Sequence, residues 1–256
     1  MIASLGMYDF GPAMAANDRL WAGIRDGLRA RGLAAPEELT RGEAAYWPAW
    51  QSPELVLSQT CGYPFRARLQ DRVAYVGTPD YGIEGCAPGH YRSVLVARAD
   101  DRRDRVEEFD GARLAFNEDL SQSGWAAPQN HAAKLGLRLV PVLRSGGHRL
   151  SAQAVAEGRA EIAALDAVTW RLLQAVETAV TRLKVVGMTD PTPGLPLIAA
   201  RGADVAAGFA AVTEAIAALS PEDRQCLGLR GLVRIPLADY LAVPNPPAPP
   251  AVLPGN

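Results

Sequence analysis

Apolar runs of strand length alternate with segments of helical periodicity along most of the chain. Strand-like runs occupy residues 2–5, 54–59, 72–76, 93–98, 112–116, 137–143, 161–164, 182–188 and 197–199. Apolar residues at helical spacing predict helices over residues 17–30, 61–69, 123–135, 148–157, 167–176, 203–219 and 221–227. This alternation predicts an α/β protein with a mostly parallel sheet.

Two segments rich in turn-forming residues interrupt the alternation, at 77–91 and 189–196. We interpret them as the places where the chain crosses between two lobes. The prediction is that residues 1–91 and 190–243 form a discontinuous first lobe, and that residues 92–189 form an inserted second lobe. Residues 244–256 are then a Pro-rich tail, extended or disordered. A ligand cleft is expected between the lobes, at the carboxyl ends of strands.

The composition is that of a globular protein with a substantial core. The chain has 256 residues, of which 48% are hydrophobic and 21% are charged. Its net charge of −2 gives no electrostatic footprint for a nucleic acid or an anionic membrane. No apolar stretch approaches the ~18 residues of a membrane span, so we expect no membrane insertion. An anionic ligand would have to be held by local geometry.

The cysteines and histidines give no metal-ligand spacing. Cys61, Cys86 and Cys226 are the three cysteines, and only three histidines accompany them, so we expect no metal and no cofactor. A disulfide between Cys61 and Cys86 in an oxidising compartment stays open. The first eight residues show no basic segment, apolar segment or cleavage site of an export signal. The chain is therefore expected to be a mature form or a protein that is not exported by the usual signal.

The segment from Asn117 to the predicted helix at 123–135 carries the strongest candidate chemistry. Asn117 follows a strand, and Ser121, Gln122, Ser123 and Gly124 lead into the helix. Two hydroxyls and several backbone N–H groups then lie at the positive end of a helix, where an anion can be held. Ser is also the usual N-cap residue, so plain capping remains the alternative. No Gly-Lys-Ser/Thr follows, which excludes a Walker loop.

Polar side chains also follow the first two predicted strands. Tyr8 comes just after the first strand, where cleft lining and core packing are equally expected. Ser58, Gln59 and Thr60 end the second strand, and Tyr63 opens the next helix. Four such side chains at the carboxyl end of a strand are more than a turn needs, which favours a cleft wall.

Three further candidates lie at the predicted crossover and in the second lobe. Tyr91 borders the first crossover loop, where hinge packing is the alternative. His148 opens a helix after two glycines, and it acts either as a ligand contact or as a capping histidine. Asp166 follows a strand and either contacts the ligand or caps the next helix.

The order of these pieces resembles the type 2 periplasmic binding proteins, in particular the phosphate/phosphite/phosphonate solute-binding branch. The resemblance covers roughly residues 1–240. It implies a two-lobed α/β fold, each lobe a mixed sheet flanked by helices, with the ligand cleft between the lobes. The matching pieces are Ser4-Leu5-Gly6-Met7-Tyr8, Ser58-Gln59-Thr60-Cys61-Gly62-Tyr63, Tyr91-Arg92-Ser93, Phe116-Asn117, Ser121-Gln122-Ser123-Gly124, Gly146-Gly147-His148 and the stretch from Gly158 to Asp166.

The resemblance also implies roles. Ser121, Ser123 and Gly124 are expected to bind the oxygens of a phosphonate or phosphate, with help from His148. The family commonly has an acidic residue after this histidine, and this chain has Arg149. The implied partners are a small oxyanion and, if the protein is exported, the membrane subunits of an ABC transporter; no nucleic-acid partner is implied, and a monomer is expected. The resemblance implies a periplasmic location, although the lack of an export signal leaves the cytoplasm open.

A solute-binding protein is the favoured function, and it requires no catalytic residue. The alternative is a cytoplasmic enzyme on the same fold, such as the lyases of menaquinone biosynthesis or the pyrimidine synthases of thiamine biosynthesis, which resemble this architecture and lack export signals. Cys61, His148 and Asp166 would then supply the nucleophile, the base and the group that orients it. A cytoplasmic ligand sensor is a third hypothesis.

Overall fold

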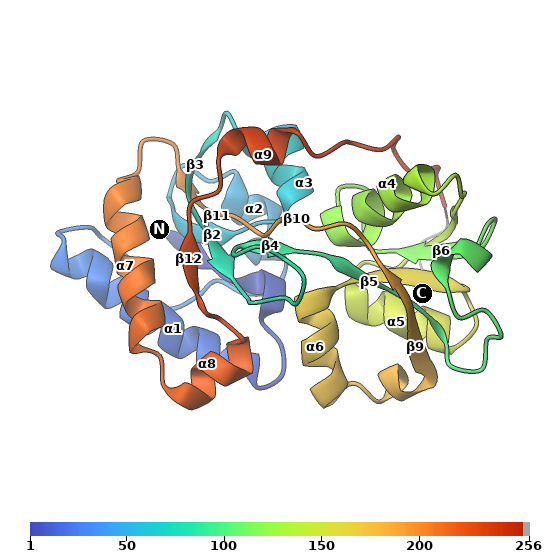
Figure 1. Cartoon of the computed structure of the whole chain (residues 1–256). Helices are drawn as coiled ribbons and strands as arrows, with labels where there is room; N and C mark the ends of the chain where they lie inside the picture. Colours follow the sequence, from blue (N-terminus) through green and yellow to red (C-terminus); the bar gives the residue numbers. More distant parts are fainter. Residues whose placement is uncertain (253–256) are drawn as a thin grey trace. The chain divides into compact units, whose positions relative to one another are not determined.

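The chain passes three times between two packed units (Figure 1). The computed structural model describes residues 1–252. The first unit contains Met1–His90 and Pro193–Leu241, and the second contains Tyr91–Thr192 together with the described residues from Ala242 onward. Each unit contains one five-stranded sheet with helices packed against it.

The sheet of the first unit has the strand order β1-β2-β11-β3-β12. Strand β1 pairs with β2 in parallel, whereas β11 is antiparallel to both of its neighbours, β2 and β3. Strand β12 is antiparallel to β3. The bounds are Ile2–Ser4 (β1), Leu55–Gln59 (β2), Val73–Asp80 (β3), Leu197–Ala200 (β11) and Gly231–Val233 (β12).

The sheet of the second unit has the strand order β7-β6-β8-β5-β9. Strand β6 is parallel to β7 and β8, and β5 is antiparallel to β8 and β9. A separate two-stranded sheet joins β4 and β10, in the segments that connect the units. The bounds are His90–Tyr91 (β4), Ser93–Arg98 (β5), Arg113–Phe116 (β6), Val140–Arg144 (β7), Ile162–Asp166 (β8), Leu183–Met188 (β9) and Thr192–Pro193 (β10).

Both sheets are therefore mixed, and the prediction of a mostly parallel sheet is wrong. Strands joined by a helix do run in parallel, as β6 and β7 do. However, β5 and β11 each follow a segment that connects the units, and each inserts between two strands in the reverse direction. Strand–helix alternation alone carries no information about such an insertion.

Most predicted helices occur, with changes at their ends. Helices α6 and α8 have the predicted bounds, whereas α1 begins four residues earlier than expected. The π-helical turns Phe65–Leu69 and Gln122–Ala126 occupy segments predicted as regular helix. The α-helices are Ala13–Ala30 (α1), Trp47–Trp50 (α2), Gly62–Pro64 (α3), Ala127–Lys134 (α4), His148–Ala156 (α5), Ala167–Val176 (α6), Val205–Ala218 (α7), Pro221–Leu227 (α8) and Leu237–Leu241 (α9), and the 3₁₀ turns are Gly6–Tyr8, Gly42–Ala45, Val106–Glu108 and Thr178–Arg182.

The segment 77–91 is not the continuous loop that its composition predicts. Strand β3 continues to Asp80, and β12 pairs with this extension. Neither β12 nor α9 was predicted. Among residues 1–252, no single helix is long and apolar enough to cross a membrane, and only α7 and α8 together meet that length and composition, with a bend of 114°.

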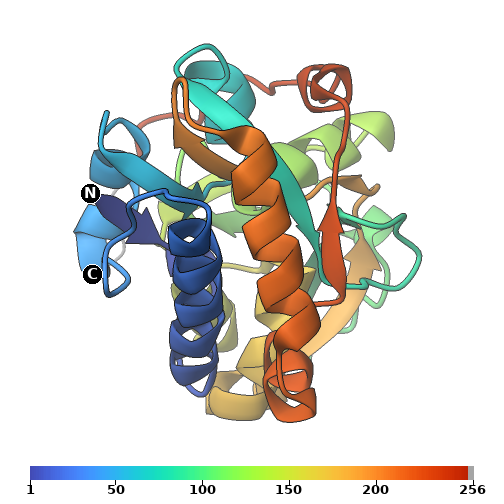
Figure 2. The same cartoon turned by 90° about the vertical axis from the view of Figure 1, so that its left-hand side faces the viewer.

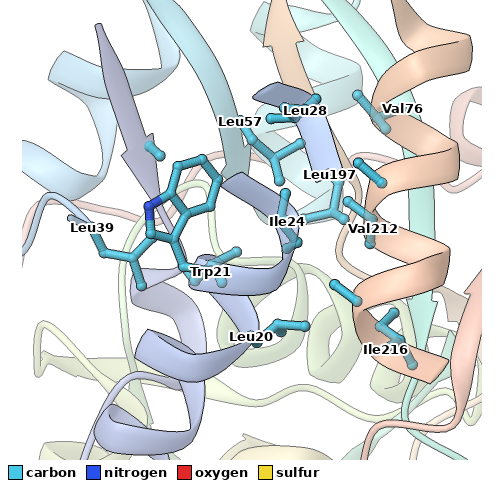
Figure 3. Packing of buried hydrophobic residues seen from close by; sticks show 14 of the residues in the cluster. Leu20, Trp21, Ile24, Leu28, Leu39, Leu57, Val76, Leu197, Val212 and Ile216 are labelled. Atoms are coloured by element: carbon cyan, nitrogen blue, oxygen red, sulfur yellow. The ribbon is translucent and has the colours of Figure 1, made fainter. Parts of the chain in front are cut away.

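Helices α1 and α7 lie side by side against one face of the first sheet (Figure 2). Leu20 and Ile24 of α1 face Val212 and Ile216 of α7, whereas the Trp21 ring lies on the other side of α1, beside Leu39 (Figure 3). All of these side chains belong to one buried cluster with Leu57 of β2. The core of the second unit forms between β5, β8 and α5, whose alanines and valines allow the helix to approach the sheet closely.

The described part of the predicted tail has no regular secondary structure and packs on the second unit. Asn130 Nδ2 donates to the Pro244 carbonyl at 2.9 Å, and Trp125 Nε1 donates to the Pro247 carbonyl at 3.2 Å. The last four residues of the predicted tail, 253–256, lie outside the described residues.

Candidate functional site

Ser121 caps the helix that begins directly after it. Its Oγ accepts the Gly124 N–H at 2.9 Å, and its carbonyl accepts the Ala126 N–H at 2.9 Å. The capping interpretation of Ser121 is therefore correct. The cap uses only a lone pair of the oxygen, so the hydroxyl proton remains available as a donor. Capping and anion binding are thus compatible roles for the same side chain.

The structure brings Ser123 and His148 together from two different strand–helix loops. Ser123 Oγ lies 2.7 Å from His148 Nε2. Gly146, with φ +87°, makes the turn that leads from β7 toward α5, where His148 is the first residue. The two side chains, 25 residues apart in sequence, form one polar pair in the second unit.

Burial keeps the His148 ring neutral at physiological pH. Desolvation lowers the pKa of His148 to about 4, and only the backbone of Ala164 acts in the opposite direction. Part of the residue is exposed, but its Nδ1 is enclosed and has no acceptor in hydrogen-bond geometry among residues 1–252. His148 can therefore donate or accept one hydrogen bond at Nε2 without adding a charge.

Gly124 is required by the close approach of Asn117. A Cβ at position 124 would lie 2.5 Å from Asn117 Oδ1 and 2.6 Å from its Cγ. The Asn117 carbonyl accepts the Gly146 N–H at 2.9 Å, which fixes the loop after β6 to the loop after β7. Asn117 is buried, and it positions the predicted anion loop through these contacts.

Asp166 is the N-cap of α6. Its Oδ1 accepts the N–H groups of Val168 at 2.7 Å and Thr169 at 3.1 Å. The contact between Asp166 and His148 involves the backbone, since the Asp166 N–H lies 3.4 Å from Nε2. Gln122 and Tyr91, also predicted site residues, are buried in the same unit.

Three buried serines support this region and were not predicted as site residues. Ser93, the first residue of β5, donates from Oγ to the Ser123 carbonyl at 2.9 Å. The Ser145 and Ser151 hydroxyls share a 2.7 Å hydrogen bond, and Ser151 Oγ also donates to Asn117 Oδ1 at 3.4 Å. The only sequence signal for them is a polar residue beside apolar neighbours, which does not identify a partner.

In the first unit, the residues at the end of β2 have different hydrogen-bond partners. Ser58 Oγ lies 2.6 Å from Ser4 Oγ and accepts the Trp50 indole N–H at 3.1 Å, so Ser58 belongs to an internal network. Gln59 Nε2 donates to the Tyr81 hydroxyl at 3.1 Å. The side chain of the next residue, Thr60, has no such hydrogen bond among residues 1–252.

Thr60 carries an unsatisfied polar atom. Its backbone N–H donates to the Pro196 carbonyl at 3.0 Å. The residue is fully buried, and its Oγ1 has no hydrogen-bond partner among residues 1–252. Because a buried hydroxyl without a partner carries a desolvation cost, Thr60 Oγ1 marks a position where a ligand or a water would complete the hydrogen bonding.

The two predicted tyrosines of the first unit make aromatic contacts. Tyr8 and Tyr81 meet edge to face with ring centroids 5.0 Å apart, so Tyr8, Tyr81 and Gln59 form one group. The Tyr63 ring lies 4.5 Å from the guanidinium of the buried Arg66, a cationic residue that the sequence did not single out.

The position after His148 is explained by a local ion pair. Arg149 Nε lies 2.6 Å from Glu177 Oε2, so this guanidinium pairs within its own unit. Cys61, Cys86 and Cys226 are all free, so the disulfide between the first two, which the sequence left open, is not formed in this structure. The three residues of the catalytic hypothesis are divided between the units: Cys61 lies in the first, and His148 and Asp166 lie in the second.

Comparison with solved structures supports the fold expected from the sequence. PhnD1 from Prochlorococcus marinus, solved with methylphosphonate, superposes with a TM-score of 0.66 at 15% identity, covering 93% of this chain and 94% of that one. A binding protein component of an ABC phosphonate transporter from Pseudomonas aeruginosa gives 0.64 at 16% identity, covering 94% and 82%. MatC from Rhodopseudomonas palustris, solved with malate, gives 0.60 at 16% identity, covering 95% and 92%. The periplasmic-binding-protein fold is thus confirmed.

Sequence comparison identifies the branch. No curated protein sequence matches the chain. The sequence pattern of one family, described as ABC transporter, phosphonate, periplasmic substrate-binding protein, matches residues 50–240. This span includes every predicted site residue except Tyr8, and it confirms the resemblance inferred from the motifs. The chain therefore belongs to the family of periplasmic substrate-binding proteins of ABC phosphonate transporters.

Proposed function

We propose that this protein binds a small oxyanion of the phosphonate class and delivers it to an ABC transporter. The observation that carries the proposal is the Ser121–Gly124 loop, which places two serine hydroxyls at a helix N-terminus with Ser123 paired to a neutral histidine. The positive end of a helix and uncharged donors together suit an anion. Membership of the phosphonate-binding family supports the same ligand class.

The loop would recognise its ligand by geometry rather than by a charge. The hydroxyl proton of Ser121 is not consumed by the cap, and the Ser123 N–H lies in the first helical turn, where no intrahelical acceptor exists. Arg149, the cation next in sequence to His148, is paired with Glu177. Neutral donors at fixed positions select an oxyanion by the placement of its oxygens.

The ring tautomer of His148 would determine what Ser123 offers to the ligand. When Nε2 carries the proton, it donates to Ser123 Oγ at 2.7 Å and leaves the hydroxyl proton free for an anion. When Nδ1 carries the proton, Ser123 must donate to Nε2 instead. The Asp166 N–H, 3.4 Å from Nε2, favours the second arrangement while no anion is bound, and an anion at the Ser123 hydroxyl would favour the first. In both arrangements His148 is a positioning partner of this hydroxyl.

The residues of the first unit are proposed as further contacts of the same ligand. Thr60 Oγ1 and the Gln59 amide are the best supported, because one lacks a partner among residues 1–252 and the other has a spare donor beyond its bond to Tyr81. Tyr8 and Tyr63 would contribute aromatic walls, and Tyr91 remains a proposed contact. Ser58 is the weakest of this set, since its hydroxyl is used by Ser4 and Trp50.

Calorimetric titration with methylphosphonate, phosphite, phosphate and sulfate tests the proposal. We expect saturable binding of at least one phosphorus oxyanion and a weakening of at least ~100-fold in Ser121→Ala/Ser123→Ala, since each lost hydrogen bond to a charged group costs about 1.5–3 kcal/mol. The matched control is Thr181→Ala, which removes an exposed hydroxyl of the second unit and should leave binding unchanged. Absence of binding by all four anions would contradict the proposal.

We also propose the family's compartment, the periplasm, for this chain. Fractionation of cells that express the full native gene tests this location. Recovery of the protein only with cytoplasmic markers would favour the sensor or enzyme hypotheses instead.

A further inference from the structure

The peptide group between Ser123 and Gly124 is held at both ends. Its N–H, on Gly124, donates to Ser121 Oγ at 2.9 Å. Its carbonyl, on Ser123, accepts the Ser93 hydroxyl at 2.9 Å. Because the N–H and C=O of a trans peptide point in opposite directions, these two bonds fix the orientation of the whole plane.

The Ser123 carbonyl needs an outside donor because of Pro128. In the π-helical turn, the Ala126 N–H bonds to the Ser121 carbonyl and the Ala127 N–H bonds to the Gln122 carbonyl, five residues back in each case. The next amide in this register would reach the Ser123 carbonyl, but it belongs to Pro128, which has no N–H. A buried carbonyl is thereby left without its helical partner.

Ser93 supplies the missing donor from a different part of the fold. It is the first residue of β5 and is 1% exposed, and its own N–H donates to Thr189 Oγ1 at 3.0 Å. Thr189 returns its N–H to the Ser93 carbonyl at 3.0 Å. Ser93 lies just after the first connection between the units, and Thr189 lies just before the second. The two hydrogen bonds to Thr189 therefore fix the position of Ser93.

We propose that Ser93 is a positioning residue of the anion loop, which keeps the Ser123 carbonyl turned inward and the Ser123 hydroxyl against His148. This inference rests on the proposed function of the loop. Without the Ser93 hydroxyl, the peptide plane is held only through Gly124, and rotation would bring a carbonyl oxygen toward the bound anion. Like charges repel, so anion affinity falls even though Ser93 does not touch the ligand.

The pairing of Ser93 with Pro128 provides a rescue experiment. Ser93→Ala should weaken methylphosphonate binding about tenfold, as expected for one net hydrogen bond. Adding Pro128→Ala restores an N–H that can donate to the Ser123 carbonyl in the π-helical register, so Ser93→Ala/Pro128→Ala should recover most of the affinity. Val96→Ala, on the same strand, removes buried methyl groups without touching the loop and serves as the stability control.

A second readout needs no ligand. Amide hydrogen exchange at Gly124, followed by NMR, reports whether the peptide plane is held. We expect faster exchange in Ser93→Ala, wild-type exchange in Val96→Ala and slower exchange again in the Ser93→Ala/Pro128→Ala double variant. Urea unfolding of each variant confirms that the fold persists.

The outcomes separate this inference from the function on which it rests. If the wild type binds none of the oxyanions, the proposed function fails, and the Gly124 exchange alone decides the role of Ser93. If the wild type binds methylphosphonate while Ser93→Ala binds it equally well and keeps Gly124 protected, the positioning role is wrong and the function stands. Equal weakening in Val96→Ala, or no recovery in the double variant, also overturns the role.

Discussion

At the scale of single residues, His148 connects the candidate site to the stability of the second unit. The pKa of His148 falls from 6.5 to about 4 on folding, because burial disfavours the charged ring. Between these two pH values the unfolded chain binds a proton that the folded protein does not. The free energy of unfolding therefore rises with pH across this window, and protonation below pH 4 no longer distinguishes the two states.

We predict that this group contributes about 3 kcal/mol to the difference in unfolding free energy between pH 4 and pH 7. Urea unfolding of the wild type and His148→Gln at several pH values measures the effect, and the variant should show the shallower dependence. His90→Gln is the matched control, since the Nδ1 of that ring lies 3.2 Å from the Pro88 carbonyl, two residues away in the first unit. Equal slopes for the wild type and His148→Gln would show that burial of the ring does not shift its titration.

The site was partly predictable at this scale. A Ser-x-Ser-Gly sequence before a helix indicates a cap and an anion loop, and the structure shows the cap at Ser121. The partners of the loop were not predictable, because Ser93 and Ser123 lie 30 residues apart and Ser93 and Thr189 lie 96 apart. A serine at the start of an apolar strand carries no information about which carbonyl it will reach.

At the scale of elements, small residues set the distance between α1 and α7. A Cβ on Gly23 would lie 3.1 Å from Ala215 Cβ, and one on Gly27 would lie 3.2 Å from Ala211 Cβ. Two glycines four residues apart thus form the face of α1 that receives the alanines of α7. Gly208, also in α7, is different: a Cβ there would meet Val76 at an ordinary 3.4 Å, beside a cavity of about 250 Å³.

We therefore predict opposite effects of filling these positions. Gly23→Val should lower the free energy of unfolding by about 2 kcal/mol, because the added methyl groups overpack the helix interface. Gly208→Ala should raise it by about 1 kcal/mol, because alanine stabilises a helix interior and here meets no close contact. Urea unfolding followed by circular dichroism measures both. Destabilisation by Gly208→Ala would mean that the backbone there needs glycine for a reason other than space.

The types of most elements were predictable from the sequence. The directions of the strands and the two elements that follow α8, β12 and α9, were not. The predicted bounds of α6 and α8 agree with the structure at both ends. Each of these helices begins directly after a residue that caps it, Asp166 for α6 and Ser220 for α8. Strand β12 is three residues long and only half-buried, so its sequence resembles a loop. Its identity comes from pairing with β3, a contact between residues about 150 positions apart.

At the scale of the whole molecule, the first unit is built from both ends of the chain. Strand β11, from the second segment, lies between β2 and β3 of the first segment, so neither segment forms this sheet alone. The end of β2, with Gln59 and Thr60, depends on that insertion, because the Thr60 N–H bonds to Pro196 just before β11. Positions 59 and 60 are thus fixed by the segment that returns to the first unit after residues 91–192 of the second.

The proposed ligand contacts include Gln59 of the first unit and Ser121 of the second. If both residues contact the ligand, substitution of either one should weaken binding to a similar extent. We predict that Gln59→Ala and Ser121→Ala each weaken methylphosphonate binding by about tenfold or more, since each removes a donor to a charged ligand. Gln51→Ala, an exposed glutamine of the first unit, is the control for Gln59→Ala and should bind as the wild type does. Thr181→Ala remains the control for the second unit.

Thermal unfolding gives an independent measure of how each substitution changes the affinity for methylphosphonate. At a methylphosphonate concentration of about 100 times Kd, binding should add ~2.7 kcal/mol to the free energy of unfolding of the wild type. Gln59→Ala and Ser121→Ala at that same concentration should each lose about half of this gain, because a tenfold rise in Kd removes ~1.4 kcal/mol of linkage. A loss in Ser121→Ala alone would mean that the second unit binds the oxyanion without Gln59, and the proposed contact of the first unit would then be wrong.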